Sequence, residues 1–237
     1  MQAELDQKQH LVLEVHHRLS EVYGRQIKYF HDLDPLSELV SALLSHRTRN
    51  SNSGQAFKNL KALFGTWETV RDAPTADVEA AISPCTWPEQ KAPRIQQVLR
   101  LVTSRCDGHL SLDFLAGMPV AEARSWLEQM PGVGPKTSAA VLSFSTLRGK
   151  ALPVDSHHFR VVVRLGIIEE KTGEAKAHKV LEDLLPEAFT AQDFYDHHQV
   201  VMRHGQKVCC YQRPDCMHCV LLDICPTGKS ILSKSLK

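Results

Sequence analysis

Residues 127–142 read LEQMPGVGPKTSAAVL, two apolar helical stretches joined by a turn rich in proline and glycine. Gly132 and Gly134 carry no Cβ, so the backbone there can adopt positive φ angles and approach another molecule closely. The turn leads into a second helix, whose free main-chain N–H groups form a ready site for a phosphate. Contacts between backbone amides and phosphates bind DNA without regard to its sequence. The pattern is typical of a helix-hairpin-helix motif, and an ordinary corner between two helices is the simpler alternative.

Lys136 stands in the first turn of the second helix, where the helix macrodipole disfavours a positive charge. A lysine in that position has a larger neutral fraction, which a lysine nucleophile requires. A lysine that only contacts a phosphate is the alternative. Further along, Asp155 directly precedes an apolar helical stretch and is expected to cap it. A carboxylate held there could also accept a proton or stabilise a developing positive charge.

The rest of the chain predicts further helices, because apolar residues recur at three- and four-residue spacing. Asp34 and Pro35 are expected to begin one of them, and Gly65 and Gly205 are each expected to end one. Segments with the alternating pattern of a strand are scarce, so the predicted fold class is all-α. The predicted helices cover residues 11–22, 36–44, 55–64, 92–102, 120–127, 136–147, 156–165, 174–185 and 194–204.

Five of the seven cysteines lie close together near the C-terminus, and four of them follow the pattern Cys209-x6-Cys216-x2-Cys219-x5-Cys225. Thiolates gathered in this way select zinc or an iron–sulfur cluster. Disulfides are disfavoured, because the cysteine count is odd and no signal peptide is apparent. A zinc site usually shows two paired C-x-x-C units, and only one such unit is present here. Cys210 is left over.

The composition is that of an ordinary globular protein, with 43% hydrophobic and 23% charged residues in a chain of 237. A net charge of +1 does not by itself indicate a nucleic-acid binder. No apolar stretch approaches the roughly 18 residues that a membrane-spanning helix needs. The N-terminal segment is polar and amphipathic, unlike a signal peptide. We therefore expect a soluble, intracellular and cytoplasmic protein.

Three motifs occur in one order: MPGVGPKTSAAVL, VDSHHFRV and the four-cysteine spacing. Together they resemble the endonuclease III family of DNA glycosylases, in the helix-hairpin-helix glycosylase superfamily. The resemblance implies two helical domains that flank a DNA-binding groove. One would be a helical bundle over residues 34–148 that carries the hairpin. The other would be discontinuous, joining residues 1–33 to residues 149–237, with the cysteine loop at its C-terminus.

The resemblance also implies roles for the residues singled out above. Lys136 would be the nucleophile and Asp155 the activating carboxylate. A damaged nucleotide would be flipped out of duplex DNA, because its sugar cannot be reached inside the stack. Lys136 would then displace the base, form a Schiff base and cut the strand by elimination. A monomer acting on oxidised pyrimidines or abasic sites in double-stranded DNA is expected.

A [4Fe–4S] cluster is the cofactor that the resemblance implies, with Cys210 outside the ligand set. Its expected ligands are Cys209, Cys216, Cys219 and Cys225. The loop between the first two would present Arg213 and the neighbouring Lys207 to phosphates, although Arg213 could also be an ordinary exposed charge.

Other DNA contacts follow from positions that match the family pattern. Gly132 and Gly134 would contact a phosphate through the hairpin. Arg47 stands where relatives usually carry a glutamine that fills the gap left by the flipped base. Trp87 could be the wedge that enters the base stack, or a half-buried packing residue. His157 matches a histidine of the family motif.

Two other functions remain open from the sequence. One is a monofunctional mismatch glycosylase that removes uracil or thymine without cutting the strand. The other is a catalytically silent iron–sulfur protein that binds DNA or senses redox state, against which Lys136 and Asp155 argue. Relatives that remove adenine lack a lysine at the position of Lys136, so they match less well.

Overall fold

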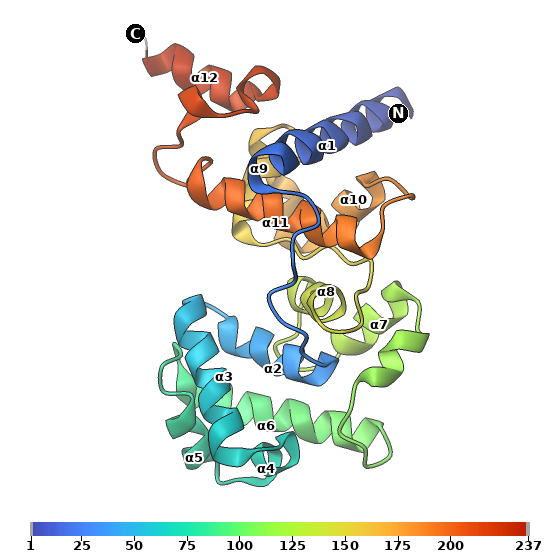
Figure 1. The fold of residues 1–237 in the computed structure, drawn as a ribbon, viewed down its shortest axis with the longest axis vertical. Helices are drawn as coiled ribbons and strands as arrows, with labels where there is room; N and C mark the ends of the chain where they lie inside the picture. The colour runs from blue at the N-terminus through green and yellow to red at the C-terminus, as the bar shows by residue number, and fades with distance from the viewer. Residues whose placement is uncertain (1, 236–237) are drawn as a thin grey trace. The chain divides into compact units, whose positions relative to one another are not determined.

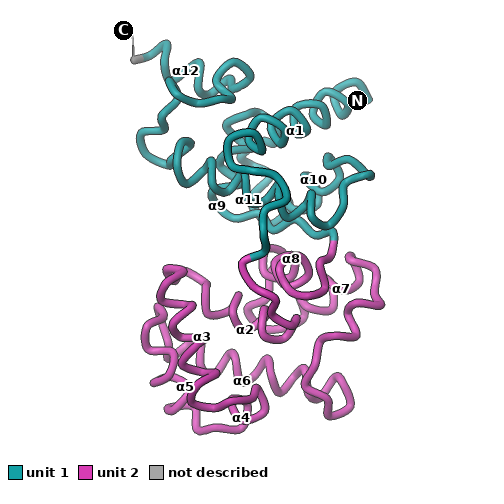
Figure 2. Tube along the Cα trace, in the orientation of Figure 1, with its two compact units in different colours: residues 1–29, 150–237 teal, residues 30–149 magenta. Residues whose placement is uncertain are grey.

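The computed structural model describes residues 2–235, and every regular element in this range is a helix (Figure 1). This confirms the predicted all-α fold class. The chain divides into two compact units (Figure 2). Unit 1 comprises Met1–Tyr29 and Lys150–Lys237, and unit 2 comprises Phe30–Gly149.

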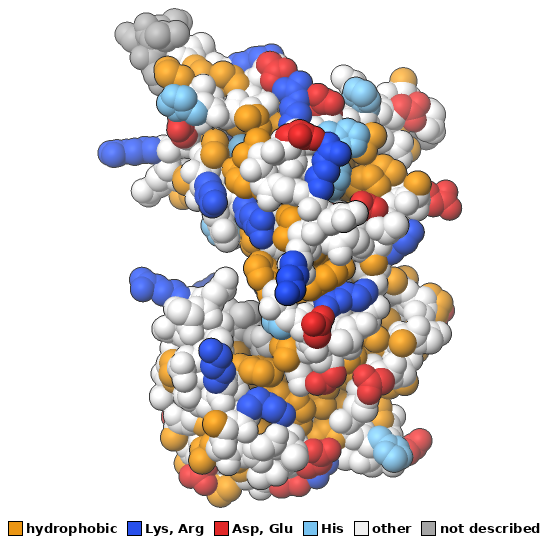
Figure 3. All heavy atoms as spheres, in the orientation of Figure 1, with side chains coloured by type: hydrophobic (Ala, Val, Ile, Leu, Met, Phe, Trp, Pro, Cys, Tyr) orange, Lys and Arg blue, Asp and Glu red, His pale blue; other side chains and the backbone are white. Residues whose placement is uncertain are grey.

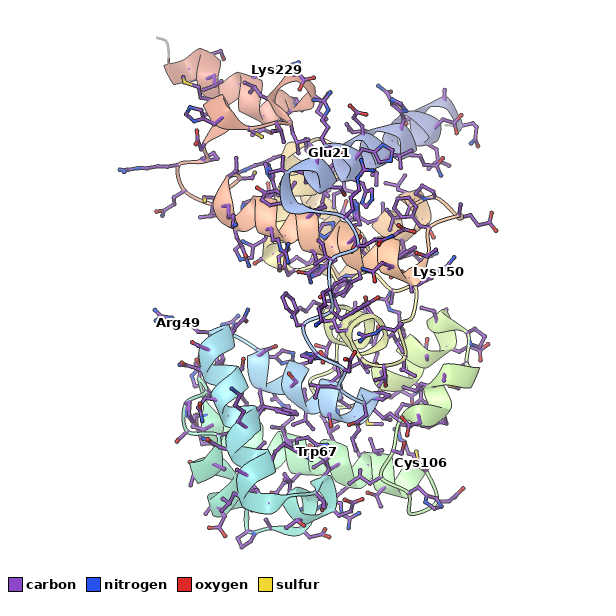
Figure 4. All side chains as sticks on the ribbon, viewed as in Figure 1. Glu21, Arg49, Trp67, Cys106, Lys150 and Lys229 are labelled. Carbon is purple, nitrogen blue, oxygen red and sulfur yellow. The ribbon has the colours of Figure 1, made fainter. Side chains whose placement is uncertain are left out.

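Unit 2 is a bundle built around one buried helix, α2, which packs against α3, α6 and α8. Asp34 caps α2 as predicted, because its Oδ1 accepts a hydrogen bond of 2.9 Å from the backbone N–H of Ser37. Trp67 lies among the helices of this unit (Figure 4) and donates to Ser37 Oγ. The elements are α2 (Pro35–Ser45), α3 (Asn50–Phe64), α4 (Trp67–Asp72), α5 (Thr75–Ala81), α6 (Pro88–Arg105), the 3-10 helix η1 (Asp113–Gly117), α7 (Val120–Leu127) and α8 (Pro135–Phe144).

Unit 1 is organised by α11, which packs against both α1 and α9. The apolar faces of these helices and of α10 form one core, in which Leu19, Val161 and Val200 are almost completely buried. The elements are α1 (Gln2–Tyr23), α9 (Ser156–Arg164), η2 (Glu170–Thr172), α10 (Gly173–Leu184), α11 (Ala191–Lys207), η3 (Cys216–His218), η4 (Leu222–Ile224) and α12 (Pro226–Ser235).

Gly205 does not end a helix, so this part of the prediction was wrong. Helix α11 continues to Lys207, and a Cβ on Gly205 would lie 2.8 Å from the backbone oxygen of His157. A glycine is needed because α9 and α11 meet backbone to backbone at this point. Gly65, in contrast, does end α3, as predicted.

The core of unit 1 also contains buried histidines whose rings contact one another. The ring centroids of His158 and His197 lie 5.4 Å apart, and those of His158 and His198 lie 6.1 Å apart. Neither ring nitrogen of His158 has a hydrogen-bond partner among the described residues. Burial, with a smaller effect from neighbouring histidines, lowers the pKa of His197 to about 3 and that of His158 well below its ordinary value. These rings are therefore neutral in the folded protein.

We expect unit 1 to be acid-labile for this reason. The folded-state pKa values of His158 and His197 are lowered, so the unfolded chain binds more protons once the pH falls below the ordinary histidine value of 6.5. Each histidine then lowers the free energy of unfolding by about 1.4 kcal/mol per pH unit. Urea unfolding at a series of pH values between about 7.5 and 5 measures this slope.

His158→Phe should reduce the slope, whereas His10→Gln should not, because His10 is exposed on α1. Equal slopes in the wild type and in His158→Phe would contradict the assignment of His158 as a neutral buried ring.

Candidate functional site

The hairpin between α7 and α8 depends on one of its two glycines. Gly132 has a φ of +83°, in the left-handed region, and a Cβ there would lie 2.7 Å from Cδ of Arg94. Gly134 has a φ of −109° and caps the N-terminus of α8. The expectation that both glycines use positive φ is thus wrong for Gly134. A Cβ on Gly134 would meet nothing within 4 Å, so this residue leaves open space in front of the helix.

Lys136 is half-buried in the first turn of α8, and its charge acts on two side chains of the same unit. One is Glu38 on α2, and the other is His46, which directly follows α2. His46 Nε2 lies 3.0 Å from Oγ1 of Thr137, the residue after Lys136. Burial, together with the smaller effect of the charge of Lys136, lowers the pKa of His46 to about 4. A neutral imidazole and a buried carboxyl therefore lie around this amine.

Glu38 is a residue that sequence reasoning missed. It is 4% exposed, and His31 Nε2 lies 3.3 Å from its Oε2. Burial raises the pKa of Glu38 to about 8, while the charges of Lys136 and Arg148 act in the opposite direction. A glutamate on a helix is normally solvent-exposed. The one available signal was that Glu38 is the only charged residue of an otherwise apolar helix, PLSELVSALLS.

Asp155 caps α9, as predicted. Its Oδ1 accepts a hydrogen bond of 2.7 Å from the backbone N–H of His158. The backbone just before it is also fixed, because the N–H of Val154 donates to His178 Nε2 at 3.0 Å and His198 Nδ1 lies 2.7 Å from the oxygen of Pro153. Asp155 belongs to unit 1, whereas Lys136 belongs to unit 2.

The four predicted cysteine ligands line one cavity in unit 1, together with mainly apolar residues. Hydrogen-bond donors point at three of the sulfurs. The N–H of Leu221 lies 3.4 Å from Cys219 Sγ, that of Gly228 lies 3.3 Å from Cys225 Sγ, and Nη1 of Arg164 lies 3.3 Å from Cys209 Sγ. Cys210 is not among the lining residues, and its Sγ lies 3.3 Å from the oxygen of Gln206.

The donor set of this cavity fits a positively charged metal cluster. Burial raises the pKa values of Cys216, Cys219 and Cys225, and the neighbouring thiolates raise them further. These three thiols therefore ionise together only if a cationic group compensates their charge. In the described part of the chain, no three His, Cys, Asp or Glu side chains are close enough to share a single metal ion. The four cysteine residues line a cavity, and N–H donors are directed at three of their sulfurs.

Helix α9 connects Asp155 to the cysteine loop through two arginines. Arg160 donates to the oxygens of Gly205 at 2.6 Å and of Cys209 at 2.9 Å. Arg164 donates to the oxygen of Cys210 at 2.8 Å and to that of Tyr211 at 3.0 Å. Helix α9 thus begins directly after Asp155 and, through its two arginines, also holds the backbone at the start of the cysteine loop.

The remaining predicted contact residues lie at several places on the two units. Arg47 and Trp87 are exposed in unit 2, with the guanidinium 5.8 Å from the centroid of the ring. Lys207 and Arg213 are exposed in unit 1. His157 is half-buried, and its Nδ1 lies 3.1 Å from Nη2 of Arg160.

The positive charge is dispersed over one face of the molecule. On the face that Figure 3 shows, Lys and Arg side chains are scattered among acidic and uncharged ones. Arg49, at the start of α3, projects away from the ribbon (Figure 4). Among the described residues, none of the helices has both the length and the apolar character needed to cross a bilayer.

Comparison of the sequence with protein families finds one match. Residues 40–187 match the model of the HhH-GPD superfamily base excision DNA repair proteins. A candidate DNA glycosylase of Arabidopsis thaliana is 35% identical over 73% of this chain, which spans 57% of that relative's length. Endonuclease III of Thermotoga maritima is 29% identical over 86% of this chain and 89% of its own. Endonuclease III of Escherichia coli K12 is 26% identical over 90% of this chain and 93% of its own.

Solved structures share the fold. A trapped covalent intermediate of endonuclease III with DNA superposes with a TM-score of 0.79 at 22% identity, covering 94% of this chain and 98% of the other. A thermostable thymine-DNA glycosylase superposes with a TM-score of 0.76 at 19% identity, covering 95% of this chain and 98% of the other.

The two hairpin glycines should respond differently to substitution. Gly132→Ala should lower the free energy of unfolding by about 1–2 kcal/mol, because alanine is strained at positive φ. Gly134→Ala should lower it less, because the backbone and the open space accept a methyl group and the only loss is that alanine is a weaker N-cap than glycine. Urea unfolding of the two variants compares them directly, and equal losses would contradict the different roles of the two glycines.

Proposed function

The chain belongs to the HhH-GPD superfamily of base excision DNA repair proteins and is a DNA glycosylase of the endonuclease III type, and we propose that it is also an abasic-site lyase. As a monomer, it would remove an oxidised pyrimidine from double-stranded DNA and then cut the strand. One observation carries the proposal: a lysine, Lys136, stands in the first turn of α8 directly after the glycine hairpin.

The proposed reaction uses Lys136 as a neutral amine. Its Nζ attacks C1′ of a flipped nucleotide, the bond from C1′ to the base breaks, and the base leaves with the electron pair. The nitrogen then loses a proton, the bond between C1′ and the ring oxygen O4′ breaks as O4′ takes up a proton, and a protonated Schiff base forms between Nζ and C1′. Removal of a proton from C2′ then expels the 3′ phosphate, and water releases the lysine. Asp155 would accept a proton or stabilise the positive charge that develops on the sugar.

The surroundings of Lys136 within unit 2 support this role. The neutral imidazole of His46 and the buried carboxyl of Glu38 lie near the amine. Neither side chain therefore places a second positive charge beside it. The first turn of α8 places the positive end of the helix macrodipole at this amine.

We propose that Cys209, Cys216, Cys219 and Cys225 hold a [4Fe–4S] cluster, with Cys210 outside the ligand set. Thiolates are the ligands of such clusters, and the N–H donors at three of these sulfurs stabilise thiolates. When bound, the cluster would fix the fold of the loop rather than act on the base.

The proposed DNA contacts are of two kinds. The hairpin and the cysteine loop would bind phosphates, and two exposed residues of unit 2 would contact bases. Phosphate contacts are assigned to Gly132, Gly134, Lys207 and Arg213, and His157 is assigned to the DNA strand near Asp155. Base contacts are assigned to Arg47 and Trp87.

Borohydride trapping tests the lyase proposal. Wild-type protein incubated with an abasic duplex should give a covalent adduct, because reduction fixes the Schiff base. Lys136→Ala should give none, whereas Lys58→Ala should trap normally, because Lys58 is an exposed lysine of α3. Absence of an adduct with the wild type would contradict the proposal, and strand cleavage only after alkali would favour a monofunctional glycosylase.

Asp155→Asn separates the two roles of this residue. Asparagine caps a helix about as well as aspartate, so stability should be retained. The carboxylate is lost, so single-turnover base removal should slow by about 100-fold or more. Wild-type rates in a stable Asp155→Asn variant would remove Asp155 from the chemistry.

Iron and acid-labile sulfide assays on anaerobically purified protein test the cofactor. Cys219→Ser should lose most of both and become less stable, because three thiolates hold the cluster poorly. Cys210→Ser is the matched control and should keep both. One equivalent of zinc without iron in the wild type would overturn the assignment.

A further inference from the structure

Two exposed residues of unit 2 hold an unusual backbone conformation side by side. Arg47 has a φ of +50° and Trp87 a φ of +54°. Left-handed backbone at residues other than glycine is strained by about 1–3 kcal/mol each and persists only where surrounding structure enforces it. The Arg47 guanidinium lies 5.8 Å from the centroid of the Trp87 ring, within the range of a cation–π interaction.

Lys91 is the residue that enforces this arrangement. It belongs to α6 and is only 5% exposed. Its Nζ donates to the oxygens of Leu44 at 2.7 Å and His46 at 2.8 Å, and to Oγ1 of Thr48 at 2.7 Å. An ammonium group has three donors, so all of them are used. Loss of any of these hydrogen bonds would leave a buried charge incompletely paired, so the residues that accept them are held in place.

The position of Lys91 at the end of α2 has a physical reason. Helix α2 ends at Ser45, where the last carbonyl groups lack partners in the helix and the macrodipole is negative. Lys91 supplies both hydrogen bonds and a positive charge at this end. The chain then leaves the helix in a single conformation, with Arg47 directly beyond it.

A second set of hydrogen bonds ties the segment 46–49 to the segment 84–87. The backbone N–H of Thr86 donates to Thr48 Oγ1 at 3.1 Å, and Thr86 Oγ1 donates to the oxygen of Arg47 at 3.0 Å. Thr48 Oγ1 is thus shared by Lys91 and Thr86. Since His46 also contacts Thr137, the same network reaches the first turn of α8, beside Lys136.

We propose that Arg47 and Trp87 form one preassembled contact element for damaged duplex DNA, and that Lys91 is the positioning residue that builds it. The inference rests on the proposed function for its ligand, DNA. An indole offers a face for stacking on a base, and a planar guanidinium offers several donors to a base edge. Because the two side chains are already ordered before DNA binds, binding does not have to include the entropy cost of ordering them.

Binding to a duplex with a stable, uncleavable abasic-site analogue tests the inference. Lys91→Met keeps an unbranched apolar side chain but removes the ammonium, and it should weaken binding by about tenfold or more, as expected for loss of one stacked contact. Affinity for an undamaged duplex should change little. Thr86→Val, at an exposed position, should give a smaller loss in the same direction.

Gln96→Met is the matched control. Gln96 lies five residues beyond Lys91 on the same helix, is 0% exposed and donates to the oxygens of Val70 and Ala73 instead of to the segment that carries Arg47. It should lower stability without a selective loss of affinity for the abasic analogue.

A second readout needs no DNA. In the wild type, Arg47→Ala should shift the NMR signal of the Trp87 indole N–H, because the guanidinium lies over the ring. In the Lys91→Met background the same substitution should shift it less, because the two segments are no longer held together.

The outcomes separate this inference from the proposed function. If Lys91→Met and Thr86→Val bind the abasic analogue as the wild type does, or if Arg47→Ala leaves the Trp87 signal unchanged, the inference is overturned. A wild type that is not trapped by borohydride, yet loses affinity on Lys91→Met, overturns only the lyase proposal. A wild type that does not prefer the abasic analogue overturns the preassembled element as a damage contact.

Discussion

Lys136 lies in the first turn of α8, at the positive end of the helix macrodipole, and the packing of unit 2 around that turn determines which side chains surround its amine. The left-handed backbone of Gly132 turns the chain so that α8 begins at Pro135, one residue before Lys136. Helix α2 packs against α8 and brings Glu38 and His46 to the same region. The amine therefore has a buried carboxyl and a neutral imidazole as neighbours.

In unit 1, α9 has a comparable organising role. Asp155 caps its first turn, and Arg160 and Arg164 on later turns hold the carbonyl groups at the start of the cysteine loop. The close approach of α9 to α11 at Gly205 fixes where this helix lies in the core. One short helix thus carries both Asp155 and the two arginines that hold the loop.

Features that depend on local sequence were predictable, and features that depend on packing were not. The caps by Asp34 and Asp155 and the all-α class follow from residue type and spacing, and the structure confirms them. The prediction for Gly205 was wrong because glycine is common both at helix C-termini and where two helices cross closely. Only the position of the neighbouring helix α9 shows which of the two applies. Glu38 and Lys91 were missed because their burial comes from residues distant in the sequence. The short helices α4 and α5 carry too few turns for a clear periodicity.

The central claim is that one particular amine forms the covalent bond to DNA. Peptide mapping by mass spectrometry, after borohydride reduction of the wild type on an abasic duplex, tests it most directly. We predict that the reduced sugar adduct is found on the peptide that contains Lys136. An adduct on another lysine or on the N-terminal amine, with Lys136 unmodified, would contradict it.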